Sequence, residues 1–511
     1  MTLRNGLISG ARHRSHAEIE HHAMQGAAGL RSLGVEPGDA VALLLRNDFA
    51  FFEASFAAQA AGVYAVPINW HLAPAEVGYI LEDSDAKVLI AHADLLAHVT
   101  ERVPEGVTVL AVPTPPEIVE AYGLTVDACA VPAGIRTWES WLSEFEPLAE
   151  PYPQVAETMM YTSGTTGLPK GVRRDMQNAP DAAKIAAMRD MVYGIKPGIR
   201  ALTTGPLYHA APNSFSLRAA RVADALVIMP RFDAEDCLKI IEAERITTTF
   251  MVPTMFVRMM KLPEETRAVY DVSSLRYIMH AAAPCPSEIK RRMIDWLGPV
   301  IHEFYGGTEG GYWTISNSED WLSKPGTVGR PPEGVVLKAL DANGREVPSG
   351  VPGQLYGWLE CFPDFTYNKR AEARREVERD GLITLGDVGF FDDDGYLFIC
   401  DRAKDMVVSG GANIYPAEIE AELSHMQGVA DSAVFGIPDE EFGEKLMAIV
   451  QLQPDADVSA DEIMDHLRRH LAGFKVPRVI EFRDTLPRGD DGKIYKRRLR
   501  DPYWEGHERN V

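Results

Sequence analysis

Helical and extended hydrophobic patterns alternate along the first ninety residues, and this alternation is the strongest constraint on the fold. Apolar residues recur at helical spacing from Ala17 to Leu33, and Gly34 follows as a stop. The next apolar run, from Ala40 to Leu45, is typical of a buried strand. The exchange continues with helical patterns at 48–61 and 74–82 and extended patterns at 63–68 and 87–91. Because helices that connect strands make those strands parallel, the pattern predicts an α/β fold with sheets covered by helices.

A second, shorter alternation follows a charged cluster at residues 401–405. Helical patterns at 416–425 and 459–471 are interleaved with extended patterns at 431–435 and 446–452. Ser459 and Glu462 have the spacing of a capping box, which begins a helix. We therefore expect a large N-terminal domain of residues 1–401 and a small α+β C-terminal domain of residues 402–511.

Composition excludes several classes of partner. The chain carries 51 Lys and Arg residues against 74 Asp and Glu residues, a net charge of −23, which argues against nucleic acid or an anionic membrane surface as the main partner. The five cysteines have no metal-binding spacing, so reduced thiols in a cytoplasmic protein are the simplest interpretation. We find no leader-like start and no apolar run of about 18 residues that would span a bilayer.

The segment from Tyr161 to Gly171 concentrates hydroxyls, glycines and one lysine after an apolar stretch. Glycines let backbone N–H groups approach an anion closely, the hydroxyls add neutral donors, and Lys170 adds a mobile positive charge. Its spacing differs from that of the Walker loop, in which a Lys-Ser/Thr pair begins a helix. The segment predicts a loop that binds a polyphosphate.

This loop resembles the phosphate loop of the adenylate-forming (AMP-binding) superfamily, and further motifs of the same family recur in the same order. These are Pro206-Leu207-Tyr208-His209, Ala281-Ala282-Ala283-Pro284, Tyr305-Gly306-Gly307-Thr308-Glu309, Leu385-Gly386-Asp387, Arg402 and the Gly492-Lys493 turn. The chain is most similar to bacterial acyl-CoA synthetases (fatty acid–CoA ligases). Leu382 and Leu385 depart from the aromatic residue and the threonine that the family commonly has there.

The resemblance implies an ATP-dependent carboxylic acid:CoA ligase that acts in fatty acid or lipid metabolism. An acid and ATP give an acyl-adenylate and pyrophosphate, and CoA then displaces AMP to give the acyl-CoA. Magnesium is the implied metal, with Glu309 and Thr165 as ligands, and Lys493, Glu309, Thr308 and Lys170 as catalytic residues. The motif Tyr305–Glu309 is expected in a loop at the end of a strand.

The resemblance also assigns binding residues. ATP and AMP binding falls to Thr162, Ser163, Gly164, Thr165, Thr166, Gly167, Lys170, Ala282, Ala283, Pro284, Glu303, Tyr305, Gly306, Thr308, Asp387, Arg402 and Lys493. The acyl pocket is assigned to His209, Phe215, Met279, Ala281, Gly306, Gly307 and Tyr312, and the CoA tunnel to His209, Ser409, Gly410 and Gly411. Lys404 is the implied hinge, near 402–405, about which a mobile small domain turns.

The substrate acid stays open at this stage. Small residues and apolar or aromatic side chains in the predicted pocket suit a medium- or long-chain fatty acid and a bulky aryl or alicyclic acid equally. Three other functions are alternatives: a carrier-loading adenylation domain, a luciferase-like oxygenase, and a non-catalytic nucleotide-binding module. The first normally has an aspartate after His209, which residues 210–217 lack, and the last would be expected to have lost Lys170, Glu309 or Lys493. Oligomeric state is open as well.

Overall fold

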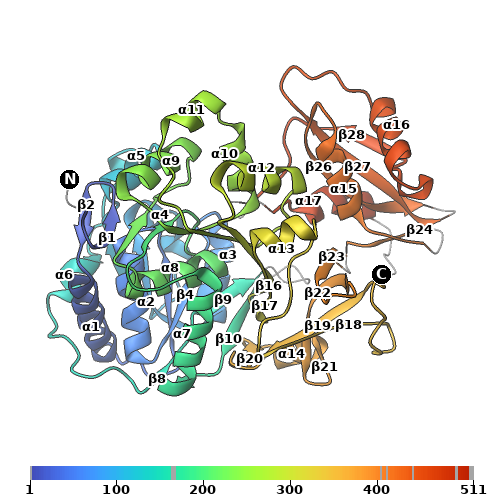
Figure 1. The fold of residues 1–511 in the computed structure, drawn as a ribbon. Helices are drawn as coiled ribbons and strands as arrows, with labels where there is room; N and C mark the ends of the chain where they lie inside the picture. The colour runs from blue at the N-terminus through green and yellow to red at the C-terminus, as the bar shows by residue number, and fades with distance from the viewer. Residues whose placement is uncertain are drawn as a thin grey trace.

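The computed structural model describes residues 3–162, 169–402, 405–409, 412–439, 442–489 and 493–505. It shows a large N-terminal body, blue through yellow to light orange in Figure 1, and a smaller C-terminal body in darker orange and red beside it. Within these described residues, no helix has both the length and the apolar character that a membrane span needs.

A parallel sheet contains the strands predicted near the N-terminus. Its order is β4-β3-β5-β6-β7, with β3 at Ala40–Leu44, β4 at Tyr64–Pro67, β5 at Ala86–His92, β6 at Thr108–Val112 and β7 at Arg136–Thr137. Every residue of β3 is buried, as a strand covered on both faces requires. The helix α1 (His16–Ser32) precedes β3, α2 (Phe49–Ala61) connects β3 to β4, and α3 (Pro74–Asp83) connects β4 to β5. The predicted alternation of helix and strand is thus confirmed.

The largest sheet that the structure describes has eight strands in the order β17-β16-β15-β14-β12-β13-β1-β2. Its strands are β1 (Gly6–Ser9), β2 (Arg12–Arg14), β12 (Arg200–Thr203), β13 (Ala225–Ile228), β14 (Thr248–Met251), β15 (Tyr277–His280), β16 (Ile301–Gly307) and β17 (Gly311–Ser316). All neighbours pair in parallel except β2 and β17 at the two edges. Because parallel strands end at one edge of a sheet, the segments after β12, β15 and β16 come together there.

Helices connect the strands of this sheet and cover its faces (Figure 1). They are α7 (Ala179–Tyr193), α8 (Ala210–Val222), α9 (Ala234–Glu244), α10 (Pro253–Lys261), α11 (Glu264–Val269) and α12 (Ser287–Leu297). Shorter helices lie elsewhere in the large body, at α4 (Ala93–Val99), α5 (Pro116–Tyr122), α6 (Trp138–Leu142), α13 (Ser318–Ser323) and α14 (Ala371–Glu376).

Antiparallel strands complete the large body. The order β20-β10-β9 joins β9 (Met160–Thr162), β10 (Lys170–Arg174) and β20 (Phe365–Tyr367), and β8 (Gln154–Val155) pairs with β11 (Gln177–Asn178). Another sheet contains β18 (Val335–Leu340), β19 (Gly353–Leu359), β21 (Glu378–Arg379), β22 (Leu382–Phe391) and β23 (Leu397–Arg402).

The small body has its own sheet and its own apolar core. Its strands are β24 (Val407–Ser409), β25 (Ala412–Ile414), β26 (Val429–Asp439), β27 (Gly443–Leu452) and β28 (Val479–Phe482), and its helices are α15 (Pro416–His425), α16 (Ala460–His470) and α17 (Lys496–Arg500). Ser459 and Glu462 form the predicted capping box at the start of α16. Buried side chains of β24, β27, α15 and α16 form the core. The domain boundary between residues 401 and 402 stays a prediction.

One expected loop is largely strand. Tyr305, Gly306 and Gly307 belong to β16 itself, which turns through Thr308 and Glu309 into the antiparallel β17. A Cβ on Gly306 would lie 1.9 Å from the Gly311 carbonyl oxygen, so this hairpin requires glycine at position 306. The prediction of a loop was therefore wrong for the first half of the motif, because the hairpin partner is contributed by residues that follow it.

Candidate active site

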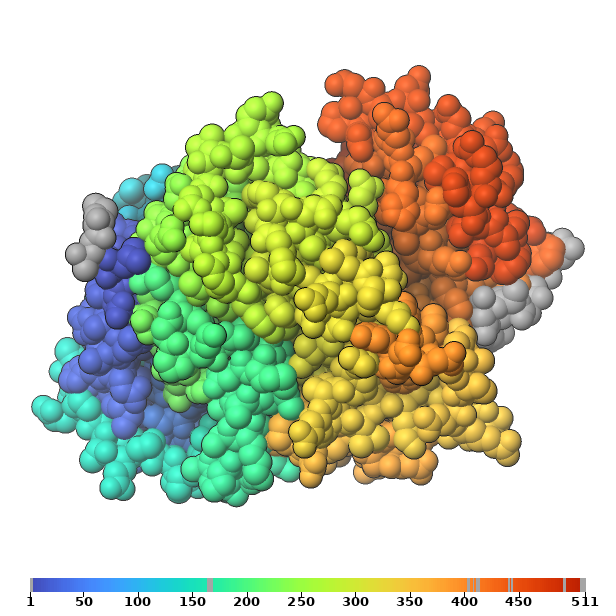
Figure 2. Space-filling model, in the orientation of Figure 1, coloured from blue at the N-terminus to red at the C-terminus, as the bar shows by residue number. Residues whose placement is uncertain are grey.

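A cleft of about 3060 Å³ lies between the large and the small body. On the large body its walls include β10, β22 and the segments that follow β12 and β15, together with the β16–β17 hairpin. On the small body they include α15, α17 and the segment just before α17. Figure 2 shows a recess where the orange and red residues meet the yellow and green ones. Both bodies can therefore act on a ligand held in this cleft.

The predicted phosphate loop is the connection of a β-hairpin. Thr162 ends β9, Lys170 begins β10, and the two residues pair across the ladder. Lys170 lines the cleft, and its Nζ lies 5.1 Å from the centre of the Tyr367 ring. The predicted ligands Ser163, Gly164, Thr165, Thr166 and Gly167 lie outside the described residues. The structure thus brings both ends of the loop to the cleft.

Glu309 lies at the cleft and accepts hydrogen bonds from two hydroxyls. Thr162 Oγ1 donates to Glu309 Oε1 at 3.3 Å, and the Tyr367 hydroxyl donates to the same oxygen at 3.1 Å. A carboxylate beside hydroxyls provides the hard oxygen donors that Mg²⁺ prefers, so these residues fit the predicted magnesium site. Thr308 precedes Glu309 in the same turn and also lines the cleft.

Arg174 is a site residue that the sequence analysis missed. Its Nη2 donates to the carbonyl oxygens of Thr308 and Glu309, the latter at 2.8 Å, and its Nη1 donates to the Pro363 carbonyl oxygen at 2.8 Å. The guanidinium also lies over the Phe362 ring, 4.0 Å from its centroid. Burial lowers the pKa of Arg174 to about 10, although nearby Glu157 and Glu309 oppose that shift. Arg174 therefore fixes the backbone of the turn that presents Thr308 and Glu309.

A pattern in β10 could have pointed to Arg174. Lys170, Val172 and Arg174 share one face of the strand because side chains alternate with a period of two. An arginine on the same face as the phosphate-loop lysine would therefore point toward the same region. Tyr367, which contacts Glu309 from a strand almost 60 positions later, had no comparable local signal.

Asp387 lies in β22 at the cleft, directly after Gly386, whose φ of 81° is in the left-handed region. Its carboxylate is largely buried, and the Tyr305 hydroxyl donates to its Oδ2 at 2.7 Å. The backbone of Arg402 is the ladder partner of Asp387 across β22 and β23. Tyr305, Asp387 and Arg402, predicted separately to bind the nucleoside, are therefore adjacent in the structure.

The small-residue segment after β15 also lines the cleft. Ala282 has a φ of 78°, which is uncommon for a residue with a Cβ and marks local backbone strain. Ala283 and Pro284 follow it along the same wall. Glu303, on the neighbouring strand β16, is buried and paired with the buried Lys290 ammonium, so its charge is compensated within the protein.

The residues predicted for the acyl pocket divide into two groups. Those that line the cleft are His209, Ala281, Gly306, Gly307 and Tyr312. Phe215 and Met279 are fully buried in the core and are not among the residues that line the cleft. The prediction that these two side chains form the wall of the acyl pocket was therefore wrong. Phe215 packs edge-on against Tyr193, which does line the cleft, with ring centroids 5.6 Å apart. The hydrophobic pattern could not distinguish an apolar pocket wall from the core behind it.

The small body contributes Lys493 to the cleft. Close by, the buried Lys496 Nζ pairs with Glu420 at 2.8 Å and joins α17 to α15. Ser409 lies in β24 and is absent from the lining residues of this cleft. Lys404, Gly410 and Gly411 lie outside the described residues. The face that carries Lys493 therefore forms the wall of the cleft in this arrangement.

The chain around the predicted hinge is attached to the small body. Asp401 Oδ2 accepts a hydrogen bond from the backbone N–H of Ala417 at 2.8 Å, and Asp405 Oδ1 lies 3.4 Å from Arg500 Nη1. These contacts connect the segment to α15 and α17, respectively. In a rotation about Lys404, the contact between Asp405 and Arg500 would therefore move with the small body, whereas the hydrogen bond between Asp401 and Ala417 would have to break.

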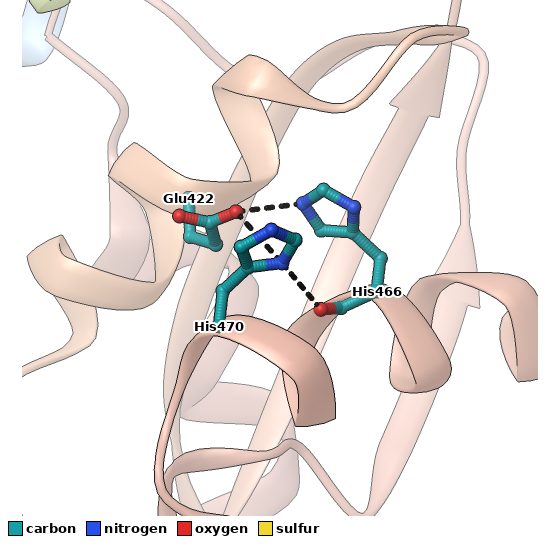
Figure 3. A group of neighbouring side chains, drawn as sticks. All are labelled: Glu422, His466 and His470. Carbon is teal, nitrogen blue, oxygen red and sulfur yellow. Dashed lines mark hydrogen bonds and ion pairs between the residues drawn. The ribbon is translucent and has the colours of Figure 1, made fainter.

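A cluster of His466, Glu422 and His470 lies on the small body (Figure 3). None of these three residues lines the cleft. His466 Nε2 lies 2.7 Å from Glu422 Oε1, and His470 Nδ1 contacts the His466 carbonyl oxygen at 2.8 Å. A carbonyl oxygen only accepts, so His470 Nδ1 carries a proton. Because both contacting nitrogens already have hydrogen-bond partners, we assign the cluster a structural role that joins α15 to α16.

Comparison with protein families places both bodies in one enzyme family. The family described as AMP-binding enzyme matches residues 4–358, and the AMP-binding enzyme C-terminal domain matches residues 418–493. A feruloyl-CoA synthase of Amycolatopsis is 34% identical over 95% of this chain and 93% of its own length. A long-chain-fatty-acid–CoA ligase of Mycobacterium tuberculosis is 33% identical over 96% of this chain and 93% of its own length.

Solved structures share the fold over nearly the whole chain. ATP-bound MatB from Rhodopseudomonas palustris superimposes with a TM-score of 0.84 at 26% identity, covering 99% of this chain and 97% of that one. The o-succinylbenzoate CoA synthetase of Bacillus subtilis, solved with its acyl-adenylate intermediate, has a TM-score of 0.79 at 26% identity, covering 97% and 95% of the two chains.

Proposed function

The chain belongs to the AMP-binding enzyme family, and from that premise we propose that it activates a fatty acid of medium or long chain, or a bulky aryl or alicyclic acid, and transfers it to CoA. The enzyme is an AMP-forming acyl-CoA synthetase, with ATP and CoA as co-substrates. The observation that carries the site assignment is the convergence of Lys170, Thr308, Glu309, Asp387 and Lys493 on one cleft.

In the first half-reaction a carboxylate oxygen of the acid attacks the α-phosphorus of ATP. The bond between that phosphorus and the bridging oxygen breaks, and pyrophosphate leaves with the electron pair. Lys493 neutralises the negative charge that accumulates where the carboxylate meets the α-phosphate, while Thr308 donates to that phosphate. Lys170 balances charge on the leaving pyrophosphate, and Asp387 accepts hydrogen bonds from the ribose hydroxyls.

Glu309 would hold Mg²⁺, with Thr165 as the second proposed protein ligand. The ion supplies charge neutralisation of the phosphate oxygens when it is bound. Thr162, Tyr367 and Arg174 keep the Glu309 turn in one position for this task. Their contribution is preorganisation: the carboxylate does not have to be reoriented when the nucleotide arrives.

In the second half-reaction the CoA sulfur attacks the carbonyl carbon of the acyl-adenylate. AMP leaves with the electron pair of the broken carbon–oxygen bond, and the thiol proton passes to solvent. We propose that rotation about Lys404 replaces Lys493 at the cleft with the segment of Ser409, Gly410 and Gly411, beside which the pantetheine arm runs past His209. The domain boundary at residues 401 and 402 and a cytoplasmic location belong to the same proposal. The five free cysteines support that location.

Product analysis tests this proposal. Purified protein is incubated with ATP, Mg²⁺, CoA and a panel of fatty, aryl and alicyclic acids, and the nucleotide and thioester products are identified. AMP, pyrophosphate and acyl-CoA are the expected products, whereas ADP would place the attack at the γ-phosphate and refute the assignment.

Two site variants and a control complete that experiment. Lys170→Ala and Glu309→Gln should depress pyrophosphate release while the fold stays intact. Lys184→Ala removes a lysine of α7 that is absent from the cleft lining and pairs with Asp181, so it should retain the wild-type rate. Wild-type rates in both site variants would contradict the proposed roles.

A further inference from the structure

The inner part of the cleft in the large body carries polar groups where a simple alkyl tail would need apolar ones. Arg189 and Tyr193 of α7, Ser214 of α8 and Tyr312 of β17 all line it. Ser214 Oγ lies 2.8 Å from the Tyr312 hydroxyl, which lies 3.3 Å from the Tyr193 hydroxyl. Three hydroxyls from three elements thus form one chain of contacts beside a guanidinium.

The direction of these hydrogen bonds follows from the last member of the chain. Tyr193 donates its proton to the Ala211 carbonyl oxygen at 3.3 Å, because a carbonyl only accepts. Tyr312 donates to Tyr193, so its own proton is used as well. Ser214 must therefore be the donor to Tyr312, and its oxygen keeps lone pairs that accept a hydrogen bond.

Arg189 supplies the complementary donors. Its two terminal nitrogens form a bidentate ion pair with Glu157, at 3.1 and 2.7 Å, which uses two of its five N–H groups. Its Nε is buried and has no hydrogen-bond partner within the described part of the chain. The donors that a ligand in the cleft can reach are therefore the second N–H groups of the two terminal nitrogens, because the side chain is partly exposed and lines the cleft. Glu157 is the carboxylate that compensates this arginine. Burial raises the pKa of Glu157, but Arg189, Arg174 and Arg221 outweigh that effect, and the pKa stays below its usual value.

An unbranched alkyl tail would exclude water from these groups without offering them a partner. A site with buried polar groups discriminates strongly against an analogue that leaves them unpaired. A hydroxyl on the acyl group satisfies both needs at once, since it donates to Ser214 Oγ and accepts from Arg189. A carbonyl oxygen satisfies only the second need, and a second carboxylate would compete with Glu157 for Arg189.

We propose that the substrate is an acid whose acyl group carries a hydroxyl at its end remote from the reacting carboxylate, and that Arg189 and Ser214 recognise this hydroxyl. The inference rests on the proposed acyl-CoA synthetase activity and narrows its substrate class. Tyr312 and Tyr193 are positioning residues in this account, because they fix which proton Ser214 donates and which lone pairs it presents.

Matched pairs of acids test the proposal on the full-length enzyme. The pairs are 3-(4-hydroxyphenyl)propanoate with 3-phenylpropanoate, and 8-hydroxyoctanoate with octanoate, each scored by kcat/KM for acyl-CoA formation. In the pair that reacts better, we expect the hydroxy acid to be preferred by about tenfold or more. A difference below threefold in that pair would overturn the proposal.

Two serine variants on one helix separate recognition from general damage. Ser214→Ala should reduce the preference for the hydroxy acid to below threefold. Ser216→Ala is the matched control, because Ser216 is fully buried and bonds to Thr203 Oγ1 at 2.9 Å, away from the cleft lining, so the preference should persist. Retention of the full preference by Ser214→Ala would refute the assignment of Ser214. Absence of AMP and thioester with all four acids in wild type would instead count against the proposed function.

Discussion

Arg174 offers a sharp test of how the active site is preorganised. We consider Arg174→Lys, which keeps the positive charge but removes the planar fork that donates to the carbonyl oxygens of Thr308, Glu309 and Pro363. A lysine ammonium at the end of a flexible stem cannot reproduce these three bonds together with the stacking on Phe362. At least one bond to the Thr308–Glu309 turn is therefore lost.

The size of the effect follows from that lost bond. A hydrogen bond with a charged partner contributes about 1.5–3 kcal/mol. If this contribution is realised in the transition state, kcat/KM for adenylation should fall about 10- to 150-fold. The assay is acid-dependent exchange of labelled pyrophosphate into ATP, with the melting temperature measured in parallel to monitor the fold.

The neighbouring arginine provides the control. Arg173 points to the other face of β10, where its Nη2 donates to the Gly38 carbonyl oxygen at 2.8 Å and its guanidinium lies over the Tyr64 ring. Arg173→Lys should leave the exchange rate within about threefold of wild type, because the affected turn is not in contact with it. Wild-type exchange in Arg174→Lys, or an equal loss in both variants, would refute the reasoning.

Three further predictions concern the small body and the pH dependence of stability. Lys493→Ala should cripple adenylation yet still transfer the acyl group from chemically prepared acyl-adenylate to CoA. Lys404→Pro should instead spare adenylation and slow thioester formation, because proline fixes φ at the hinge. Single-turnover assays measure each half-reaction, and equal losses of both half-reactions in the two variants would contradict this prediction. His466→Ala should lower the free energy of unfolding of the small body by about 1 kcal/mol, because the hydrogen bond to Glu422 is lost. Denaturant unfolding measures this change, and an unchanged unfolding midpoint would contradict the assigned structural role. A hydrogen bond to Glu53 raises the pKa of His22 above its ordinary 6.5, so the stability that this pair contributes is fully present below pH 6.5 and is lost as the pH rises through the pKa of His22 in the folded protein. His22→Gln should therefore flatten this part of the curve of melting temperature against pH. Identical curves for the variant and the wild type would exclude the effect.

Local pattern was enough to predict much of the fold. The period of apolar residues identified α1, β3, α2 and β4 because the side-chain repeat of each element is a property of its own backbone. The capping box at Ser459 likewise depends on only four consecutive residues. The hairpin at Tyr305–Gly307 was misread as a loop, since its pairing partner lies further along the chain.

The sequence by itself determined the α/β alternation, the two-part organisation that we expect, and the chemistry available for nucleotide binding, because these depend on residue types and spacings within short segments. Only the tertiary structure decided which side chains meet. Arg174 and Tyr367 reach the Glu309 turn from distant strands, and Arg189, Ser214 and Tyr312 form one polar group from two helices and a strand. It also placed Phe215 and Met279 in the core, since burial depends on how elements pack and two equally apolar positions look alike in the sequence.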